Sequence, residues 1–237
     1  MISDGRDPDG VSRTITRAVE PELDTRRLAI VAAVCGAGFV AVALLVVTGA
    51  TGPADTWWHG SAASLRNPPF VWTAQAFTVV GDVPLNTAFR VAGAVWLLWR
   101  RRFTSFWAWL LAATLSPILV DWVVKPLVGR TRPLDFVWTA NGMAFPSGHA
   151  AAAATNAAIV VLLLVPARHR RAGAVAGAVW IVAMSLARTL LGAHWLSDVV
   201  GGILLGLSVT FAVVAAVFAM RAHHDRKEVG TWDARSP

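Results

Sequence analysis

Long uncharged stretches dominate this sequence and restrict what the chain can fold into. Residues 28–48 run for 21 positions without a charged side chain. Five further apolar stretches follow, at about residues 83–99, 103–124, 150–165, 172–190 and 195–220. About 20 predominantly apolar residues are enough to cross a bilayer as one helix. The sequence therefore predicts an all-α, polytopic membrane protein, built as a six-transmembrane-helix bundle.

The segment between the first two apolar stretches has a different composition. Residues 49–81 are interrupted by Gly and Pro, while Trp57, Trp58 and Trp72 are residues that favour a membrane interface. We expect an extracytoplasmic loop here, with one or two short helices lying on the membrane surface. The six-span domain is predicted over 28–220, between tails at 1–27 and 221–237, of which the second is expected to be frayed.

Lys and Arg residues are distributed unevenly between the predicted turns. Most of them fall in the two tails and in the turns at 100–102 and 168–171. Basic residues accumulate on the cytoplasmic side of membrane proteins, so both termini are predicted to be cytoplasmic in the plasma membrane. The net charge of +7 follows from this pattern and does not indicate a nucleic-acid partner. The single cysteine, Cys35, excludes a disulfide or a thiolate metal site within the chain.

Three polar segments fall on the opposite, extracytoplasmic side. They are Lys125-x6-Arg132-Pro133, then Pro146-Ser147-Gly148-His149, then Arg188-x5-His194-x3-Asp198. Ionisable groups at membrane depth are costly and usually functional. Each segment also has a structural explanation: cations at a helix end, a Ser147 helix cap, and a buried hydrogen bond between His194 and Asp198. These structural explanations would have to apply independently to three segments at one membrane face. A single site that uses all three segments explains them together.

The residue types in these segments fit phosphate chemistry. Lys125, Arg132 and Arg188 would neutralise phosphate oxygens, and Ser147 with Gly148 would form an anion cradle at a helix N-terminus. His149 lies beside the cradle, where it can protonate a leaving oxygen. His194 and Asp198, four residues apart, share a helix face, so the carboxylate can orient the imidazole as a nucleophile. One clear carboxylate among many cations predicts phosphoryl transfer without a metal or other cofactor.

These segments resemble the three-part signature of the type 2 phosphatidic acid phosphatase superfamily, which includes lipid phosphate phosphatases, glucose-6-phosphatase and vanadium haloperoxidases. The resemblance implies that His194 forms a phosphohistidine, that Asp198 orients it and that His149 protonates the lipid leaving group. Lys125, Arg132, Ser147, Gly148 and Arg188 would hold the phosphate. Many members have Ser directly before the third-segment Arg, where this chain has Ala187.

The expected substrate is a lipid phosphate or diphosphate. Polyprenyl diphosphate is favoured, and phosphatidate and phosphatidylglycerol phosphate are alternatives. The apolar spans exclude a soluble haloperoxidase. A lipid phosphotransferase using the same site and a non-catalytic transporter or binder of phosphorylated lipids remain open. The roles of Asp82, Arg90, Asp121 and Arg130 and the oligomeric state are not predicted.

Overall fold

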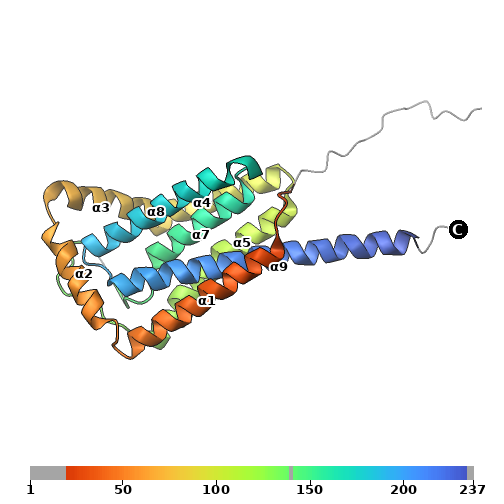
Figure 1. Ribbon diagram of the computed structural model, residues 1–237. Helices are drawn as coiled ribbons and strands as arrows, with labels where there is room; N and C mark the ends of the chain where they lie inside the picture. Colours follow the sequence, from red (N-terminus) through yellow and green to blue (C-terminus); the bar gives the residue numbers. More distant parts are fainter. Residues whose placement is uncertain (1–19, 139–140, 234–237) are drawn as a thin grey trace, which may run out of the picture.

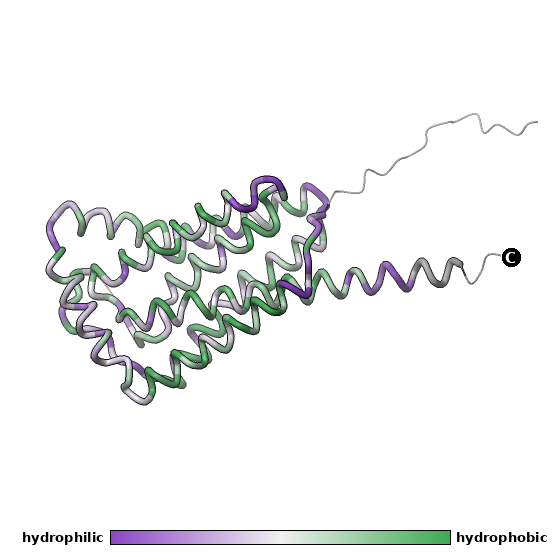
Figure 2. The backbone as a smooth tube through the Cα atoms, in the orientation of Figure 1, coloured by the Kyte–Doolittle hydropathy of each residue, from purple (hydrophilic) through white to green (hydrophobic). Residues whose placement is uncertain are grey.

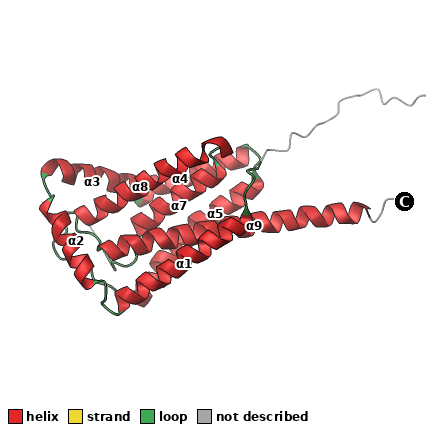
Figure 3. Cartoon of the chain, viewed as in Figure 1, coloured by secondary structure: helices red, strands yellow, loops and turns green. Residues whose placement is uncertain are grey.

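The computed structural model describes residues 20–138 and 141–233, and this part of the chain is helical without any strand (Figure 3). The all-α prediction is confirmed. The α-helices are α1 (Thr25–Val47), α2 (Gly52–Ser64), α3 (Pro68–Gly81), α4 (Val83–Trp99), α5 (Phe103–Ile118), α6 (Lys125–Val128), α7 (Gly148–Leu163), α8 (Arg170–Leu190) and α9 (Leu196–Asp233). A π-helical segment, η1 (Leu119–Val124), joins α5 to α6, and a short 3₁₀ turn, η2 (Ala167–His169), precedes α8. Residues 1–19 of the predicted tail at 1–27 lie outside the described residues.

The long helix α9 organises the bundle. Helices α1, α5 and α7 pack directly against it, α8 packs on α7, and α3 packs on α8 (Figure 1). The largest apolar core lies where α4, α5, α7 and α9 meet. Its members include Leu97, Trp109, Ile159, Leu163 and Val214, each almost completely buried. The core therefore lies in one half of the bundle and leaves the other half to the polar segments.

The outer surface of the bundle is apolar, as a lipid-facing surface requires. Val34, Leu44, Val95 and Val175 all have more than half of their surface exposed. Hydrophobic residues follow the helices along the bundle, while hydrophilic ones collect at its ends (Figure 2). Helices at 25–47, 103–128, 167–190 and 196–227 are long and apolar enough to cross a membrane, and α7 is a shorter apolar helix. The chain is thus a multi-pass membrane protein.

The segment predicted as a surface loop forms two helices. Helix α2 runs across one end of the bundle, whereas α3 lies alongside α8 (Figure 1). Ala74 of α3 packs against Ala187 and Leu191, so α3 is part of the bundle. At the other end of the bundle, α9 continues to Asp233. The prediction of a frayed tail from residue 221 is therefore wrong for residues 221–233. An ion pair of 3.5 Å between Arg221 Nε and Asp225 Oδ2, one turn apart, stabilises this extension.

Two glycines bring α9 unusually close to α7. A Cβ atom added at Gly202 would lie 2.4 Å from the Ser147 carbonyl oxygen, and one at Gly206 would lie 2.5 Å from that of Ala151. Small residues four apart allow helix backbones to approach in membranes. This contact joins the second and third polar segments, and the Ser147 N–H donates to the Asp198 carbonyl oxygen at 2.9 Å.

Candidate active site

His194 lies in the turn between α8 and α9, and Asp198 lies in the first turn of α9. The turn forms because α8 ends at Leu190 and Gly192 adopts a left-handed φ of 69°, which favours glycine. His194 Nδ1 is 3.4 Å from Asp198 Oδ2, which is within ion-pair distance, although Nδ1 makes no hydrogen bond to any described residue. The backbone N–H of Trp195 donates to the same oxygen at 2.8 Å. Both side chains are buried, so the carboxylate is fixed beside the ring.

The other nitrogen of His194 contacts Arg132. Arg132 NH1 lies 3.0 Å from His194 Nε2. A guanidinium can only donate hydrogen bonds, so Nε2 accepts and carries a lone pair, and the neutral ring has its proton on Nδ1 beside Asp198. This tautomer leaves the lone pair of the ring on Nε2.

Arg132 is also tied to the loops around the histidine. NH1 donates to the Ala193 carbonyl oxygen at 2.6 Å, and Nε donates to that of Gly142 at 3.0 Å. NH2 donates to the carbonyl oxygens of Asn141 and Met143. All five guanidinium N–H groups therefore have acceptors among the described residues, and the His194 ring is the only side chain among these acceptors.

Burial and nearby cations keep His194 uncharged. Burial lowers the pKa of His194 well below its usual value, and the charges of Arg132, Arg188 and Lys125 lower it further. His149 acts on it in the same direction. The structure therefore gathers residues from all three predicted segments around one neutral imidazole.

Arg188 and Lys125 approach this site from different helices. Arg188, in the last turn of α8, is 3% exposed and donates from NH1 to Thr78 Oγ1 of α3 at 3.2 Å. Its Nε is buried and has no hydrogen-bond partner among the described residues, so it is a donor available to an anion. Lys125 follows the π-helical turn η1, and its Nζ lies 2.6 Å from Asp121 Oδ1. That contact is the ion pair that their four-residue spacing permits.

The start of α7 forms the predicted cradle. Ser147 is its N-cap, and the side-chain oxygen accepts from the Ala150 N–H at 3.4 Å. A Cβ atom added at Gly148 would be 3.9 Å from Lys125 Nζ, which places the ammonium beside the positive end of the helix. Lys125, Gly148 and His149 line the same cavity of about 460 Å³. Free N–H groups and a lysine at a helix N-terminus suit an anion.

His149 has an acidic partner from the junction of α3 and α4. Asp82, between these helices, has Oδ1 3.0 Å from His149 Nε2. Gly81 lies against the His149 ring, because a Cβ atom there would be 2.9 Å from its Cδ2. Asp82 therefore accepts a hydrogen bond from the Nε2–H of His149 and leaves Nδ1 for other partners. Ala187, where many relatives have Ser, faces the α3–α8 contact and not this cavity.

A buried charge network lies behind Asp198, and the sequence did not predict it. Arg130 donates from NH1 to Asp198 Oδ1 at 2.7 Å and from NH2 to Asp55 Oδ2 at 2.6 Å. Ser197 donates from its backbone and its hydroxyl to Asp55, at 2.9 and 2.7 Å. Burial alone would raise the pKa of Asp55, but hydrogen bonds from Arg130 and Ser197 outweigh it and lower that pKa. The only sequence signal for Asp55 was an isolated carboxylate beside two tryptophans.

The donor set does not resemble a metal site. Across residues 20–138 and 141–233, no group of three or more His, Cys, Asp or Glu side chains is arranged to hold an ion. Around His194 the charged neighbours are mainly cations, which repel a divalent metal and attract phosphate oxygens.

Comparison with known proteins gives a consistent result. The sequence model of the PAP2 superfamily matches residues 106–222, which include all three polar segments. The chain is 26% identical over 186 residues to phosphatidylglycerophosphatase B of Bacillus subtilis, covering 74% of this chain and 89% of that protein. It also superposes on the crystal structure of a transmembrane PAP2-type phosphatidylglycerolphosphate phosphatase from the same organism. The TM-score is 0.67 at 26% identity, over 77% of this chain and 93% of the other.

Proposed function

Because this chain belongs to the PAP2 superfamily and is a phosphatase of lipid phosphates, we propose that it hydrolyses its substrate through a phosphohistidine on His194. The observation that carries this proposal is the state of the His194 ring. One nitrogen is directed to Asp198, and the other is an acceptor beside Arg132. Such a ring has its lone pair on the nitrogen nearest to the cations that attract phosphate.

The first step forms the phosphoenzyme. The Nε2 lone pair of His194 attacks phosphorus, and the bond from phosphorus to the lipid oxygen breaks with its electron pair on that oxygen. His149, held by Asp82, gives its proton to the leaving oxygen. Asp198 stabilises the positive charge that develops on the His194 ring. Charge on the phosphate oxygens is stabilised by Arg132, Arg188, Lys125 and the N–H groups near Ser147 and Gly148.

The second step returns the enzyme to its starting state. His149, now neutral, takes a proton from water while the water oxygen attacks phosphorus. The bond from Nε2 to phosphorus breaks, its electrons return to the ring, and inorganic phosphate leaves. No step requires a metal ion. An alcohol in place of water would give a phosphotransferase, so the same intermediate serves that alternative function.

The proposed membrane arrangement follows the Lys and Arg pattern. We place both termini in the cytoplasm and the site at the extracytoplasmic face, with α4 and α7 completing six spans and α2 at the membrane surface. The headgroup then belongs to a lipid of the outer leaflet. Polyprenyl diphosphate, which the sequence favours, and glycerophospholipids such as phosphatidate and phosphatidylglycerol phosphate are the candidate substrates.

Replacing the proposed nucleophile tests the mechanism. We expect purified His194→Ala to release no phosphate from phosphatidate or polyprenyl diphosphate, because the other imidazole of the site, His149, is held by Asp82 and serves as the acid. Wild-type enzyme quenched in alkali should contain labelled phosphohistidine, which His194→Ala should lack. His169→Ala, in the turn before α8, is the matched control and should keep wild-type turnover.

The same assay distinguishes the alternatives. Retained turnover by His194→Ala would contradict the mechanism. Binding of lipid phosphates by the wild type without release of inorganic phosphate would support a non-catalytic transporter or binder. Equal rates in EDTA and in MgCl₂ are expected for a metal-independent reaction. Loss of activity in EDTA that Mg²⁺ restores would contradict metal independence.

A further inference from the structure

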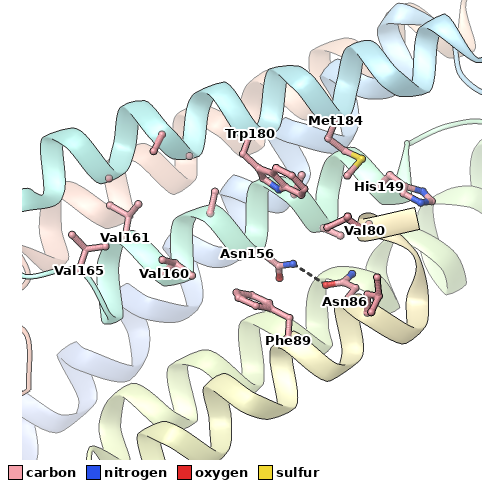
Figure 4. Close-up of a pocket in the computed structure, with 18 residues that line it drawn as sticks. Val80, Asn86, Phe89, His149, Asn156, Val160, Val161, Val165, Trp180 and Met184 are labelled. Atoms are coloured by element: carbon pink, nitrogen blue, oxygen red, sulfur yellow. Dashed lines mark hydrogen bonds between the residues drawn. The ribbon is translucent and has the colours of Figure 1, made fainter. Parts of the chain in front are cut away.

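Two grooves leave the catalytic cavity on opposite sides of α4. The first is an apolar groove of about 620 Å³ that starts at His149 and follows α7 as far as Val165 (Figure 4). The second, of about 380 Å³, lies between α4 and α5 and is lined by Val91, Leu110 and Ile118 among others. The catalytic cavity shares residues with both of them. Helix α4 packs mainly on α5 and meets α7 through side chains, and the first groove lies between α4, α7 and α8.

The first groove has the length of a lipid tail. From His149 to Leu163, α7 rises by about 21 Å, because these residues are 14 steps of 1.5 Å apart. Half of a hydrocarbon core is about 15 Å thick. Leu85 and Phe89, on the wall formed by α4, are 50% and 43% exposed, so the groove opens sideways. A single-chain lipid would occupy one groove and leave the other without a tail.

A polar cluster lies where the two grooves separate. Asn156 Nδ2 donates to Asn86 Oδ1 at 2.7 Å, and Arg90 Nε donates to Asn156 Oδ1 at 3.1 Å. The two amides lie in the middle of the otherwise apolar lining (Figure 4). Arg90 NH2 is buried without a partner among the described residues. The Asn86 side-chain nitrogen donates no hydrogen bond within this described part of the chain. The cluster therefore offers unused donors and few free acceptors.

The depth of this cluster corresponds to a definite part of a lipid. Asn86 is four residues beyond Asp82, the partner of His149, or about 6 Å along α4. Asn156 is seven residues beyond His149, or about 10 Å along α7. In a diacylglycerol phosphate, five bonds of about 1.2–1.5 Å separate phosphorus from an ester carbonyl, so its oxygen lies on the order of 6 Å away. A polyprenyl diphosphate has no ester carbonyl: its second phosphate lies nearer to the attacked phosphorus, and beyond that phosphate the chain has only carbon atoms, which accept no hydrogen bond.

We propose that Asn86, Asn156 and Arg90 form an ester-binding subsite, and that the substrate is a two-chain glycerophospholipid phosphate that straddles α4. This inference rests on the proposed function and names the substrate class of that site. The phosphate binds at the α7 cradle, the ester oxygens accept from the polar cluster, and one tail enters each groove. This substrate class differs from polyprenyl diphosphate, which the sequence alone favours.

Paired lipids that differ only in their carbonyl groups test this subsite. We would measure phosphate release by the full-length enzyme in mixed micelles from dioleoyl phosphatidate, its dialkyl ether analogue and a polyprenyl diphosphate. For the wild type, kcat/KM should be roughly 5–10-fold higher for the ester than for the ether, as expected for donors left without partners. The polyprenyl substrate should be slower than the ester lipid.

Two variants of α4 distinguish the effect of losing a hydrogen-bond donor from the effect of changing the shape of the groove. Asn86→Leu should lower kcat/KM for the ester lipid to about that of the ether and leave the ether rate within about twofold. Phe89→Leu alters the same groove without removing a donor, so its ester-to-ether ratio should remain that of the wild type. A thermal unfolding profile for each variant shows that it is folded.

Each outcome has a distinct meaning. A wild-type ratio near one, an unchanged ratio in Asn86→Leu, or a polyprenyl substrate preferred over the diacyl lipid would overturn the subsite while leaving the lipid phosphatase intact. Absence of phosphate release from every lipid would overturn the proposed function, and the subsite with it.

Discussion

At the scale of single residues, the site depends on how buried charges are paired. His194 is neutral because burial and the neighbouring cations oppose its protonation, while Asp198 is held by Arg130 and the Trp195 N–H. Arg130 serves two carboxylates, and its guanidinium also lies 5.6 Å from the centre of the Trp195 ring. Arg130 is a positioning residue, because it contacts Asp198 and reaches His194, the proposed nucleophile, only through that carboxylate.

Removing Arg130 should destabilise the protein strongly. Arg130→Met leaves Asp55 and Asp198 buried without their shared cation, which costs about 3–5 kcal/mol when a buried pair is broken. We expect a lower unfolding temperature and a lower kcat. Adding Asp55→Asn removes one of the two charges, so the double variant should be more stable than Arg130→Met alone. Strictly additive losses in a double-mutant cycle would show that the three residues do not act as a network.

The buried His194 should also make stability depend on pH. In the unfolded chain histidine titrates near pH 6.5, whereas burial lowers the pKa of the folded residue well below that value. As the pH falls below about 6.5, the unfolded state therefore binds a proton that the folded state does not, and stability decreases by at most about 1.4 kcal/mol per pH unit. His194→Gln lacks this dependence, so its unfolding temperature relative to wild type should rise between pH 7.5 and 5.5. A constant difference would mean that folding does not lower the pKa of His194.

At the scale of helices, the sequence predicted most boundaries because they follow local rules. Helix α4 begins and ends at the residues of the second apolar stretch, and α5 with η1 covers the third. The Ser147 cap and the Gly192 break are also local signals. The pairing of Asp55 with Arg130 spans 75 residues and has no periodicity that would indicate it. The α9 extension is not predicted from the sequence, because the residues from 221 onward are polar and continue no apolar stretch.

The close contact between helices α7 and α9 can be tested by adding a single methyl group at a glycine. In Gly202→Ala the new Cβ atom lies 2.4 Å from the Ser147 carbonyl oxygen, so the helices must move apart. We expect a loss of about 1–3 kcal/mol in unfolding free energy and at least a tenfold loss of kcat. Gly38→Ala is the matched control, because its Cβ atom meets Leu204 at an ordinary 3.5 Å. Equal stability of the two variants would contradict this packing role.

At the scale of the whole molecule, the proposed orientation places the site and the termini on opposite sides of the membrane. Leu134 lies in the loop before α7 and is 97% exposed, while Arg168 lies in the turn before α8. In a Cys35→Ala background, Leu134→Cys should react with a membrane-impermeant maleimide in intact cells, and Arg168→Cys should react only after permeabilisation. The reverse pattern would place the site in the cytoplasm.

The sideways opening of the α4 groove has a kinetic consequence. A lipid that enters this groove past Leu85 and Phe89 would arrive from within its own leaflet, and the dephosphorylated product would return there without passing through water. The concentration that governs turnover is then the mole fraction of substrate in the membrane plane. Dilution with inert lipid slows the enzyme, whereas dilution of the whole suspension leaves the rate per enzyme unchanged.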